Sequence, residues 1–439
     1  MPHFVKIFIL ISLSILISSC AHYKKEPWDS KFTIAVIPDT QNMVDYKQQI
    51  DKGFPVDGAA MFLEQMQYVA DNTVARGGEV IFVTSLGDVW QHRQFGIDPD
   101  HYERGLRPIN QNRKARPDLE DGIKNFEMPL AKRGYDILAQ TGVAFSVVPG
   151  NHDYDWFWRD SEFKIDRSRF DELRDETGKI VRYDPKILGM THVGGLDNFN
   201  SVFSQDSPYF KDKNWYISSF NDGANSAQIF EAGGYKFLHL GFEMQAGDGV
   251  LNWAQSVIDA NPGLPTIMST HDFLSSEGER QVRSIADFAR IDPRYHNGPE
   301  EIWQKFISKN DQIFMVLSGH NHAQATRNDK NDAGHDVHQL LSDYQDRGQS
   351  ADHAKPRKSP FLIGDGWLRL MEFDMSSKIP TVTIKTYSTY YKVFSHEHAD
   401  YANWYKKSEH AEMTDQDYNA TDHFIISLSD FKERFGQPQ

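Results

Sequence analysis

The chain has 439 residues, of which 39% are hydrophobic and 13% aromatic, and its formal net charge is −15. This composition is typical of a globular protein with a sizeable core, and it excludes wholesale disorder. The acidic balance argues against broad binding to phosphate backbones or anionic lipid, so we expect no binding to nucleic-acid polymers.

The first twenty residues have the pattern of a targeting segment. Lys6 precedes IFILISLSILI, an apolar stretch that is short for a membrane-spanning helix but typical of a secretory signal. The stretch ends in ISSC, where Cys20 is the only cysteine of the chain, so an intramolecular disulfide framework is excluded. The pattern resembles a bacterial lipoprotein signal. It predicts removal of residues 1–19, a polar tether over residues 20–31, and a cell-envelope protein anchored to the membrane through lipidated Cys20, periplasmic or surface-exposed. The alternative is a plain secretory signal in which Cys20 is incidental.

After the tether, short apolar runs alternate with helical patterns. The strand-like runs cover residues 32–39, 79–88, 143–153, 265–272 and 312–322. The helical patterns cover residues 58–78, 121–142, 247–263 and 299–310, and we expect Pro129 to break or kink the second of them. This alternation predicts an α/β fold with a layered core around a sheet that is buried on both faces.

Two polar, aromatic-rich stretches interrupt this alternation, near residues 91–120 and 154–225, and they are interpreted as insertions at one end of the sheet. Residues 366–374 and 381–388 flank the turn MSSKIP and predict a hairpin. We therefore expect one main domain over residues 32–395 and a C-terminal extension over residues 396–439.

Polar residues that can bind metals follow each of the five strand-like runs. Any one of them has an ordinary explanation as a turn or a helix cap, but five in order are hard to explain as independent caps. The carboxyl ends of strands are the edge at which sites assemble in open α/β sheets. Carboxylates, an amide oxygen and imidazoles together suit divalent Mn, Fe, Zn or Mg. The residues in question are Asp39 and Gln41, Asp88, Asn151 with His152, His271, and His320 with His322.

The motifs PDTQ, LGDVW, PGNHD, STHD and SGHNH, spread over residues 32–322, resemble those of the calcineurin-like metallophosphoesterase superfamily. The resemblance implies a four-layer α/β fold, with a two-sheet β-sandwich flanked by helices rather than one doubly wound sheet. It also implies two divalent metal ions at one edge of the sandwich. On this resemblance, Asp39, Gln41, Asp88 and His322 hold one metal, while the bridging Asp88 with Asn151, His271 and His320 holds the second.

The resemblance further implies a catalytic role for His152, as the proton donor to the leaving oxygen, with Asp153 orienting its ring. The attacking group would be a hydroxide that bridges the two metals, as is usual for two-metal hydrolysis of phosphate esters.

Gln41 departs from the usual motif of the superfamily, which is Asp-x-His rather than Asp-x-Gln. An amide oxygen is a neutral, harder and weaker donor than an imidazole nitrogen. We therefore expect weaker and more exchangeable binding at this metal, with Mn or Mg favoured over Zn.

Weaker signals surround these motifs. Residues 156–159, with the sequence WFWR, are interpreted either as an aromatic wall for a nucleobase or sugar or as an anchor that pins the insertion to the body. His92 and Arg93 follow the second motif closely enough to reach a substrate. Tyr344 and Asp365 are expected near the site or, equally, in strand and turn roles.

The sequence thus predicts a hydrolase that acts on a phosphomonoester or phosphodiester substrate. One alternative is a cyclic-nucleotide-type phosphodiesterase. The other is a catalytically silent binding or scaffold protein of the same fold, which the unusual Gln41 favours. The intact bridging residue Asp88 and the intact acid His152 oppose that second alternative.

Overall fold

The computed structural model describes residues 30–109, 116–174, 182–282, 284–356 and 361–438. The predicted signal and residues 20–29 of the predicted tether lie outside these ranges, and Lys31 already begins the first strand. Within the described ranges, no helix is both long enough and apolar enough to cross a membrane.

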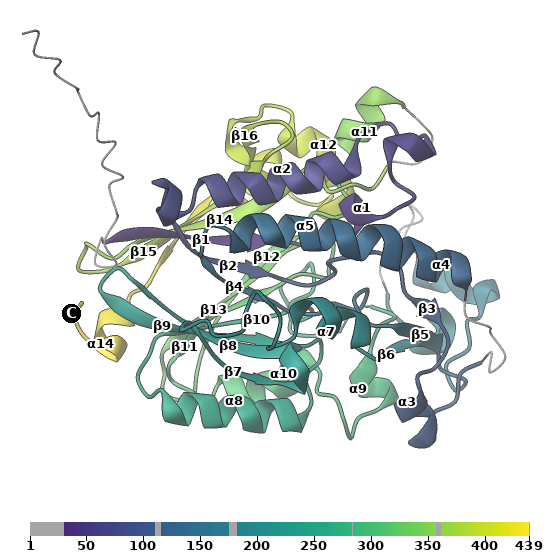
Figure 1. The fold of residues 1–439 in the computed structure, drawn as a ribbon, viewed down its shortest axis with the longest axis horizontal. Helices are drawn as coiled ribbons and strands as arrows, with labels where there is room; N and C mark the ends of the chain where they lie inside the picture. The colour runs from purple at the N-terminus through teal and green to yellow at the C-terminus, as the bar shows by residue number, and fades with distance from the viewer. Residues whose placement is uncertain (1–29, 110–115, 175–181, 283, 357–360, 439) are drawn as a thin grey trace, which may run out of the picture.

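Two mixed sheets of seven strands lie face to face (Figure 1). The first has the order β16-β15-β14-β1-β2-β4, with β17 paired to β15, and the second has the order β12-β13-β11-β10-β9-β8-β7. The strands of the first sheet are β1 (Lys31–Ile37), β2 (Val80–Ser85), β4 (Ala144–Val147), β14 (Trp367–Asp374), β15 (Thr381–Ser388), β16 (Val393–Phe394) and β17 (Phe424–Ser427). Those of the second are β7 (Tyr216–Phe220), β8 (Asn225–Ala232), β9 (Tyr235–Phe242), β10 (Thr266–Thr270), β11 (Ile313–Ser318), β12 (Gln324–Lys330) and β13 (Asp336–Ser342).

Helices cover the outer face of each sheet. Figure 1 shows α2 (Gly58–Asp71) and α5 (Met128–Ala139) on one side, and α8 (Asp248–Ala260) and α10 (Pro299–Ile302) on the other. The remaining α-helices are α1 (Gln41–Val44), α3 (Pro99–Glu103), α4 (Pro117–Gly122), α6 (Pro185–Leu188), α7 (Asp197–Phe203), α9 (Phe288–Ile291), α11 (Gln349–Ala354), α12 (Tyr401–Glu409), α13 (Asp415–Ala420) and α14 (Phe431–Phe435).

The inner faces of the two sheets form a shared apolar layer. Phe237 of the second sheet packs on Phe32 and Phe373 of the first, with ring centroids 5.5 and 6.3 Å apart. The expected four-layer α/β sandwich flanked by helices is therefore confirmed. The residue pattern alone predicted a sheet buried on both faces; the structure has two such sheets, packed on each other. A strand in this sandwich contacts helices on one face and the other sheet on the opposite face, which gives the same continuous apolar run.

Of the break or kink expected at Pro129, the break does not occur. The chain runs from α4 through a π-helical turn, Ile123–Glu127, directly into α5, and Pro129 is the second residue of α5. Met128 N bonds to Ile123 O, five residues earlier. Proline lacks an N–H and crowds the preceding turn, and the wider π-turn accommodates both without ending the helix.

The strands that lead to the predicted site run parallel. In the first sheet β2 pairs in parallel with β1 and β4, and in the second β10 pairs in parallel with β9 and β11, and β11 with β13. Their carboxyl ends therefore open on one edge of the sandwich. The predicted hairpin is confirmed as β14–β15, which pair antiparallel from Trp367 opposite Ser388 to Asp374 opposite Thr381.

A small third sheet, β3-β5-β6, is built from the two polar stretches. Its strands are β3 (Gln94–Phe95), β5 (Trp156–Arg159) and β6 (Thr191–Gly194). Figure 1 places it beyond the ends of β2 and β4, beside the edge where the predicted ligands gather. The second stretch also supplies β7, the edge strand of the second large sheet.

Candidate metal centre

The predicted ligands meet at the carboxyl edge of the sandwich. Asp39 follows β1, Asp88 follows β2, Asn151 lies in the loop after β4, and His271 directly follows β10; all four are buried. His320 follows β11 and is partly buried. Both sheets therefore contribute residues to one cluster. In the sequence, these residues lie at the ends of separate strands.

The centre of this cluster is the Nε2 atom of His271. It lies 3.3 Å from Asp88 Oδ1, 3.2 Å from Asn151 Oδ1, 3.2 Å from His320 Nδ1 and 4.0 Å from Asp39 Oδ2. Asp88, His271 and His320 each offer a ligand atom within 4.8 Å of the others. One ring nitrogen cannot form a good hydrogen bond to all of these groups, so the atoms converge as ligands of a cation do.

The orientation of the His271 ring supports this interpretation. Its Nδ1 lies 2.8 Å from Leu86 O, and a carbonyl can only accept, so the ring proton is on Nδ1. Nε2 then faces two oxygens, which is favourable only if a proton or a metal ion binds it. Burial lowers the pKa of His271, but Asp88 and Asp39 outweigh it and raise the pKa to about 10. A backbone carbonyl on the far nitrogen is the usual outer partner of a metal-bound histidine.

Buried carboxylates give the cluster a deficit of positive charge. Burial and then the neighbouring Asp343 raise the pKa of Asp39 well above its usual range. Burial also raises the pKa of Asp343, to about 6. Burial acts on Asp88 in the same direction, but His271 and His152 hold its pKa well below the usual range. Divalent cations would compensate these buried charges.

Two buried oxygens in the cluster have no hydrogen-bond partner, Asp39 Oδ1 and Gln41 Oε1. The Gln41 amide nitrogen donates to Asp88 Oδ2 at 3.0 Å and also contacts Gln345 Oε1. Buried polar atoms are rarely left unpaired, and hard oxygens of this kind are ligands for Mn²⁺ or Mg²⁺. The donor set therefore fits divalent metals, with the carbonyl oxygen of Gln41 as the atom available to one of them.

At two glycines of this edge there is no room for a side chain. A Cβ on Gly150 would lie 2.3 Å from Asp88 Oδ1, and one on Gly319 would lie 2.2 Å from Asp39 Oδ1. Asp88 and His320 adopt positive φ angles of 50° and 68°. Such strained positions cluster at functional sites, where the surrounding structure holds them in place.

His322 lies at the rim of the cluster, and its side chain is 47% exposed. Its Nδ1 contacts Asp346 Oδ2, which leaves Nε2 available to a metal. Burial lowers the pKa of His322, but the bond to Asp346 and the charge of Asp343 outweigh it and raise the pKa to about 9.

His152 is placed beside the cluster, but its ring is oriented by a different group from the one predicted. Its Nδ1 lies 2.6 Å from the carbonyl oxygen of Gln91, and its backbone N–H donates to Asp88 Oδ1 at 2.7 Å. Asp153 instead accepts from the backbone amides of Val89 at 2.9 Å and Gly150 at 2.8 Å. The orienting contact is therefore Gln91 rather than Asp153, which ties two ligand-bearing loops together.

His92, Arg93 and the aromatic run after the third motif have different surroundings in the structure. Arg93 lies with its guanidinium 4.7 Å from the ring centre of Phe157, and its buried Nε has no partner. Burial lowers the pKa of Arg93 to about 10, against the charges of Asp88 and Asp153. His92 points to Glu127, 2.7 Å away, and Trp158 is buried. The packing of Trp158 fits the anchoring alternative for this aromatic run.

A further strand end joins the cluster, that of β13. Asp343 lies close enough to raise the pKa of Asp39, and Gln345 contacts Gln41. Tyr344 points away, and its hydroxyl donates to Asp422 at 2.9 Å. Tyr344 thus has the structural role that was one of its two expected roles. Asp343 was not predicted, although the apolar run before it is the same signal that marks the other five strand ends.

Asp365, the other residue expected near the site, has a structural role in the described chain. Its carboxylate accepts from the backbone amides of Gln349 and Ser350, at 2.9 and 3.1 Å, at the start of α11. It also accepts from the hydroxyl of Tyr405 at 2.5 Å. Asp365 therefore fixes a helix start, which was the turn alternative for this residue.

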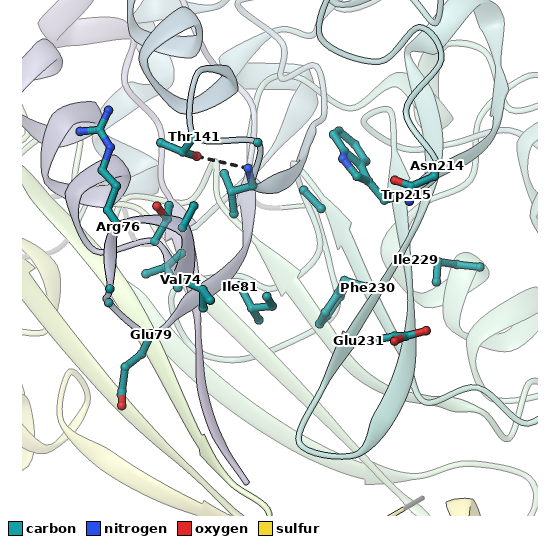
Figure 2. A pocket seen from close by; sticks show the side chains of 18 of the residues that line it. Val74, Arg76, Glu79, Ile81, Thr141, Asn214, Trp215, Ile229, Phe230 and Glu231 are labelled. Atoms are coloured by element: carbon teal, nitrogen blue, oxygen red, sulfur yellow. Dashed lines mark hydrogen bonds between the residues drawn. The ribbon is translucent and has the colours of Figure 1, made fainter. Parts of the chain in front are cut away.

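A cavity of about 1230 Å³ lies at the opposite end of the sandwich, where β2, β4 and β9 begin. Figure 2 shows Ile81, Trp215 and Phe230 lining it, with Arg76 and Glu79 to one side. Because β2 and β4 carry their ligands at their carboxyl ends, this cavity is separate from the metal cluster.

Comparison with family models finds none that matches. An uncharacterized protein of Bacillus subtilis strain 168, YvnB, is 24% identical over 280 residues, which is 62% of this chain. This chain spans 16% of that relative's length. A crystal structure of a dimetal phosphatase from Danio rerio aligns over 82% of this chain and 96% of its own, with a TM-score of 0.32 and 13% identity. The chemistry of the site therefore has to come from its own residues.

Proposed function

We propose that this protein is a metal-dependent phosphoesterase that hydrolyses a phosphomonoester or phosphodiester, as the calcineurin-like motifs imply. The observation that carries the proposal is the convergence of carboxylate, amide and imidazole ligands from parallel strand ends of both sheets. Asp88 lies between the two groups of ligands, with Gln41 on Oδ2 and His271 on Oδ1. A carboxylate has two oxygens and can serve two metals, which a histidine cannot.

Two divalent cations, when bound, would supply the positive charge that clamps a phosphate and lowers the pKa of water. Asp39, Gln41, Asp88 and His322 would hold one cation, and Asp88, Asn151, His271 and His320 the other. The chain orients the second set through Leu86, whose carbonyl fixes the His271 ring. The excess of acidic residues over the whole chain does not oppose this function, because the cations provide the local field.

His152 is positioned to deliver a proton to the leaving oxygen. The carbonyl of Gln91 holds its Nδ1–H, so Nε2 is the atom that carries the transferable proton. Burial and the charge of Arg93 lower the pKa of His152 to about 3. A bound phosphate group adds negative charge beside the ring and opposes this shift, so protonation of His152 is coupled to substrate binding.

Arg93 supplies the chain's own cation beside His152. Its charge acts on both His152 and Asp88, which places it at the same edge. The guanidinium group of Arg93 stacks on the ring of Phe157, and its Nε–H has no hydrogen-bond partner within the protein. Guanidinium groups bind phosphate oxygens in a fork geometry, so Arg93 is the proposed phosphate anchor.

The same proposal places the protein in the bacterial cell envelope. Its support is the sequence of the first twenty residues, where Lys6, the apolar stretch and ISSC precede Cys20. Lipidation of Cys20 would anchor the domain through the polar tether. Nucleotides and phosphorylated envelope polymers are the substrate classes that this location suggests.

A catalytically silent protein of the same fold is the second candidate. The observation that favours it is the Gln41 amide, whose nitrogen rather than oxygen faces Asp88. In that candidate the Gln41–Asp88 bond replaces one metal.

One experiment separates these functions. Residues 21–439 are stripped of metal and restored with Mn, Mg, Fe, Zn or Ca singly. They are then assayed on an aryl phosphate, a bis-aryl phosphate and a cyclic nucleotide, beside the His152→Ala variant. We expect metal-dependent turnover that the variant loses. Absence of turnover with every metal and ester, or turnover that His152→Ala leaves unchanged, would contradict the proposal.

A further inference from the structure

A second cluster of metal-binding side chains lies in the insertions, outside the strand-end site. His101 of α3, His192 of β6, and Asp292 and His296 after α9 each offer a ligand atom within 4.8 Å of the other three. His101, His192 and Asp292 are buried, and His296 is partly buried. Long stretches of chain separate these residues, so the cluster exists only in the folded protein.

Each of the three imidazoles is held by an acceptor on its Nδ1 atom. His101 Nδ1 lies 2.6 Å from Asp98 Oδ2, His192 Nδ1 lies 2.5 Å from Val193 O, and His296 Nδ1 lies 3.2 Å from Gln245 O. Carboxylate and carbonyl acceptors on the far nitrogen place the proton on Nδ1. This is the arrangement that orients histidines around a metal, because it leaves Nε2 as the donor atom.

Two of the three Nε2 atoms are buried and have no protein partner. His101 Nε2 and His192 Nε2 are both buried and lack a hydrogen-bond partner. The two rings lie 4.5 Å apart edge to face, and His192 lies 5.1 Å from His296 in the same manner. Two buried acceptor nitrogens without a donor are unfavourable, and a cation that both could bind would remove this cost.

Burial and neighbouring imidazoles act together on the histidines of the cluster. Burial, then His296 and His101, lower the pKa of His192 well below its usual range. Burial and His101 lower the pKa of His296 to about 3. A histidine binds a metal through the lone pair of its neutral form, and the acceptor on Nδ1 together with the unpartnered Nε2 of His192 fits that form. Arg104 pairs with Oδ2 of Asp292 and fixes that carboxylate.

We propose that His101, His192, Asp292 and His296 form a structural zinc site. Three imidazoles and one carboxylate complete a tetrahedral set, and zinc is the ion that such a set suits best. Four protein ligands leave no open position for water or substrate, and the donor atoms are mostly buried. The site is therefore structural, and it is distinct from the two-metal centre at the strand ends.

A second group has residue types that suit a metal, but its contacts differ from those of a metal site. Asp45, His92 and Glu127 also offer atoms within 4.8 Å of one another. There, however, His92 Nδ1 binds Glu127 at 2.7 Å, and its Nε2 lies 2.8 Å from the ammonium group of Lys47. Both ring nitrogens are satisfied and a cation is already present. In the cluster around His192, by contrast, the Nε2 atoms of His101 and His192 have no partner, and the nearby cation Arg104 pairs with the carboxylate of Asp292.

Zinc at this position would join the small sheet to the segment that follows α9. Asp98 and His101 can lie close to β6 because residue 194 is a glycine. A Cβ there would lie 1.8 Å from Asp98 Oδ2 and 2.7 Å from His101 Nδ1. The acceptor of His296 is Gln245, whose side chain donates to Asp272 at 3.1 Å, beside the ligand His271. The zinc site thus supports the wall of the strand-end centre without contacting substrate.

Zinc retention by the full chain tests this inference. The protein is loaded with zinc, treated with a mild chelator and analysed for bound metal, in parallel with His192→Ala, Asp88→Asn and His353→Ala. His353 is an exposed histidine of α11 and serves as the matched control. We expect about one zinc per chain to remain in the wild type, in Asp88→Asn and in His353→Ala, and to be lost in His192→Ala. Retention of the same zinc by His192→Ala would overturn the inference.

A second measurement does not depend on the folding of a variant. Zinc-edge anomalous scattering from crystals of the wild-type chain should show a peak about 2.0–2.2 Å from the Nε2 atoms of His101, His192 and His296. Crystals grown in excess zinc without a peak at this position would overturn the inference, even if both metals are seen at the strand ends. Failure of the phosphoesterase assay leaves this result unaffected, so the two proposals are tested separately.

Discussion

The side-chain amide of Gln41 donates to Asp88 Oδ2 at 3.0 Å, and its carbonyl oxygen is buried without a hydrogen-bond partner. The two residues follow different strands, β1 and β2, whose parallel pairing brings their ends together. The amide nitrogen therefore lies between Asp88 and Gln345, and the oxygen is the atom of Gln41 that has no partner. Because of this relationship, we predict that substitution of Gln41 changes the metal preference of the proposed centre.

Gln41→His is expected to tighten binding at one metal position and to shift the preference from Mn or Mg towards Zn. The physical reason is that imidazole is a softer and stronger donor than an amide oxygen. Titration calorimetry of the metal-free chain with Mn and Zn measures the change. Gln67→His, on α2, adds a histidine away from the site and should leave both affinities unchanged. An unaltered ratio of Zn to Mn affinity in Gln41→His would show that Gln41 is not a ligand.

His152→Ala is expected to lower kcat by about 10²–10⁴, the range for loss of a general acid. The loss should be larger on an alkyl phosphate than on an aryl phosphate, because an aryloxide leaves without help from a proton. Steady-state kinetics on both esters, together with metal analysis, measures this difference. Equal losses on the two esters, or loss of bound metal, would assign His152 a role in holding the site instead.

Gly150→Ala is expected to displace Asp88 and to weaken metal binding, with a loss of about 1–3 kcal/mol in the free energy of unfolding. The added Cβ would lie 2.3 Å from Asp88 Oδ1 and 2.5 Å from Asp88 N. Gly249→Ala, in α8, is the control, because its Cβ would meet Phe220 at an ordinary 3.5 Å. Metal titration and chemical denaturation of both variants check the prediction. Wild-type metal affinity in Gly150→Ala would contradict it.

Asp422→Asn is expected to lower the free energy of unfolding by about 3–5 kcal/mol, the cost of breaking a buried ion pair. Asp422 accepts from Arg369 at 2.9 Å and from Arg347 at 3.4 Å, and all three side chains are fully buried. Without the carboxylate, two buried guanidinium groups lose part of their compensation. Asp118→Asn removes an exposed partner of Arg116 and should leave the denaturation midpoint unchanged. Equal midpoints for the two variants would contradict the prediction.

His239 is expected to make the protein less stable as pH falls. Burial lowers its pKa to about 3, while an unfolded chain has a histidine pKa of about 6.5. Between these values the unfolded state binds the proton and the folded state does not. The free energy of unfolding therefore falls by about 1.4 kcal/mol per pH unit on this account, from about pH 6.5 towards pH 3.

The variant His239→Gln measures this contribution, because it removes the titrating ring that contacts Gln228 and Ser269. Denaturation between pH 4 and 8 should show a shallower pH dependence for the variant below about pH 6.5 and parallel curves above it. Parallel curves over the whole range would show that His239 binds the same number of protons in the folded and the unfolded chain, which would contradict the prediction.

The strand ends were predictable because the signals are local. An apolar run followed by Asp39, Asp88, Asn151 or His271 can be read along the chain, and parallel pairing then sends all such ends to one edge. The division into two sheets could not be read in this way. A strand covered by helices on one face and by a sheet on the other has the same apolar pattern as one between two layers of helices, and only the resemblance to a family distinguished them.

The orientation of individual side chains also lay beyond the sequence. Asp153 directly follows His152, yet its carboxylate binds backbone amides, and the carbonyl of Gln91 holds the ring. Backbone carbonyls are present at every residue and leave no signal in a sequence. For Tyr344 the structure fits the structural alternative rather than a place at the site, because neighbouring residues after a strand point in different directions.

By itself, then, the sequence determined the alternation of strands and helices, the polar residues at the strand ends and the departure at Gln41. The tertiary structure decided which distant segments meet: Gln345 beside Gln41, and His101 and His192 beside His296. Hydrophobic periodicity is a property of neighbouring residues and is written in the chain. Contacts between separate loops depend on the packing of the whole core, which no local pattern records.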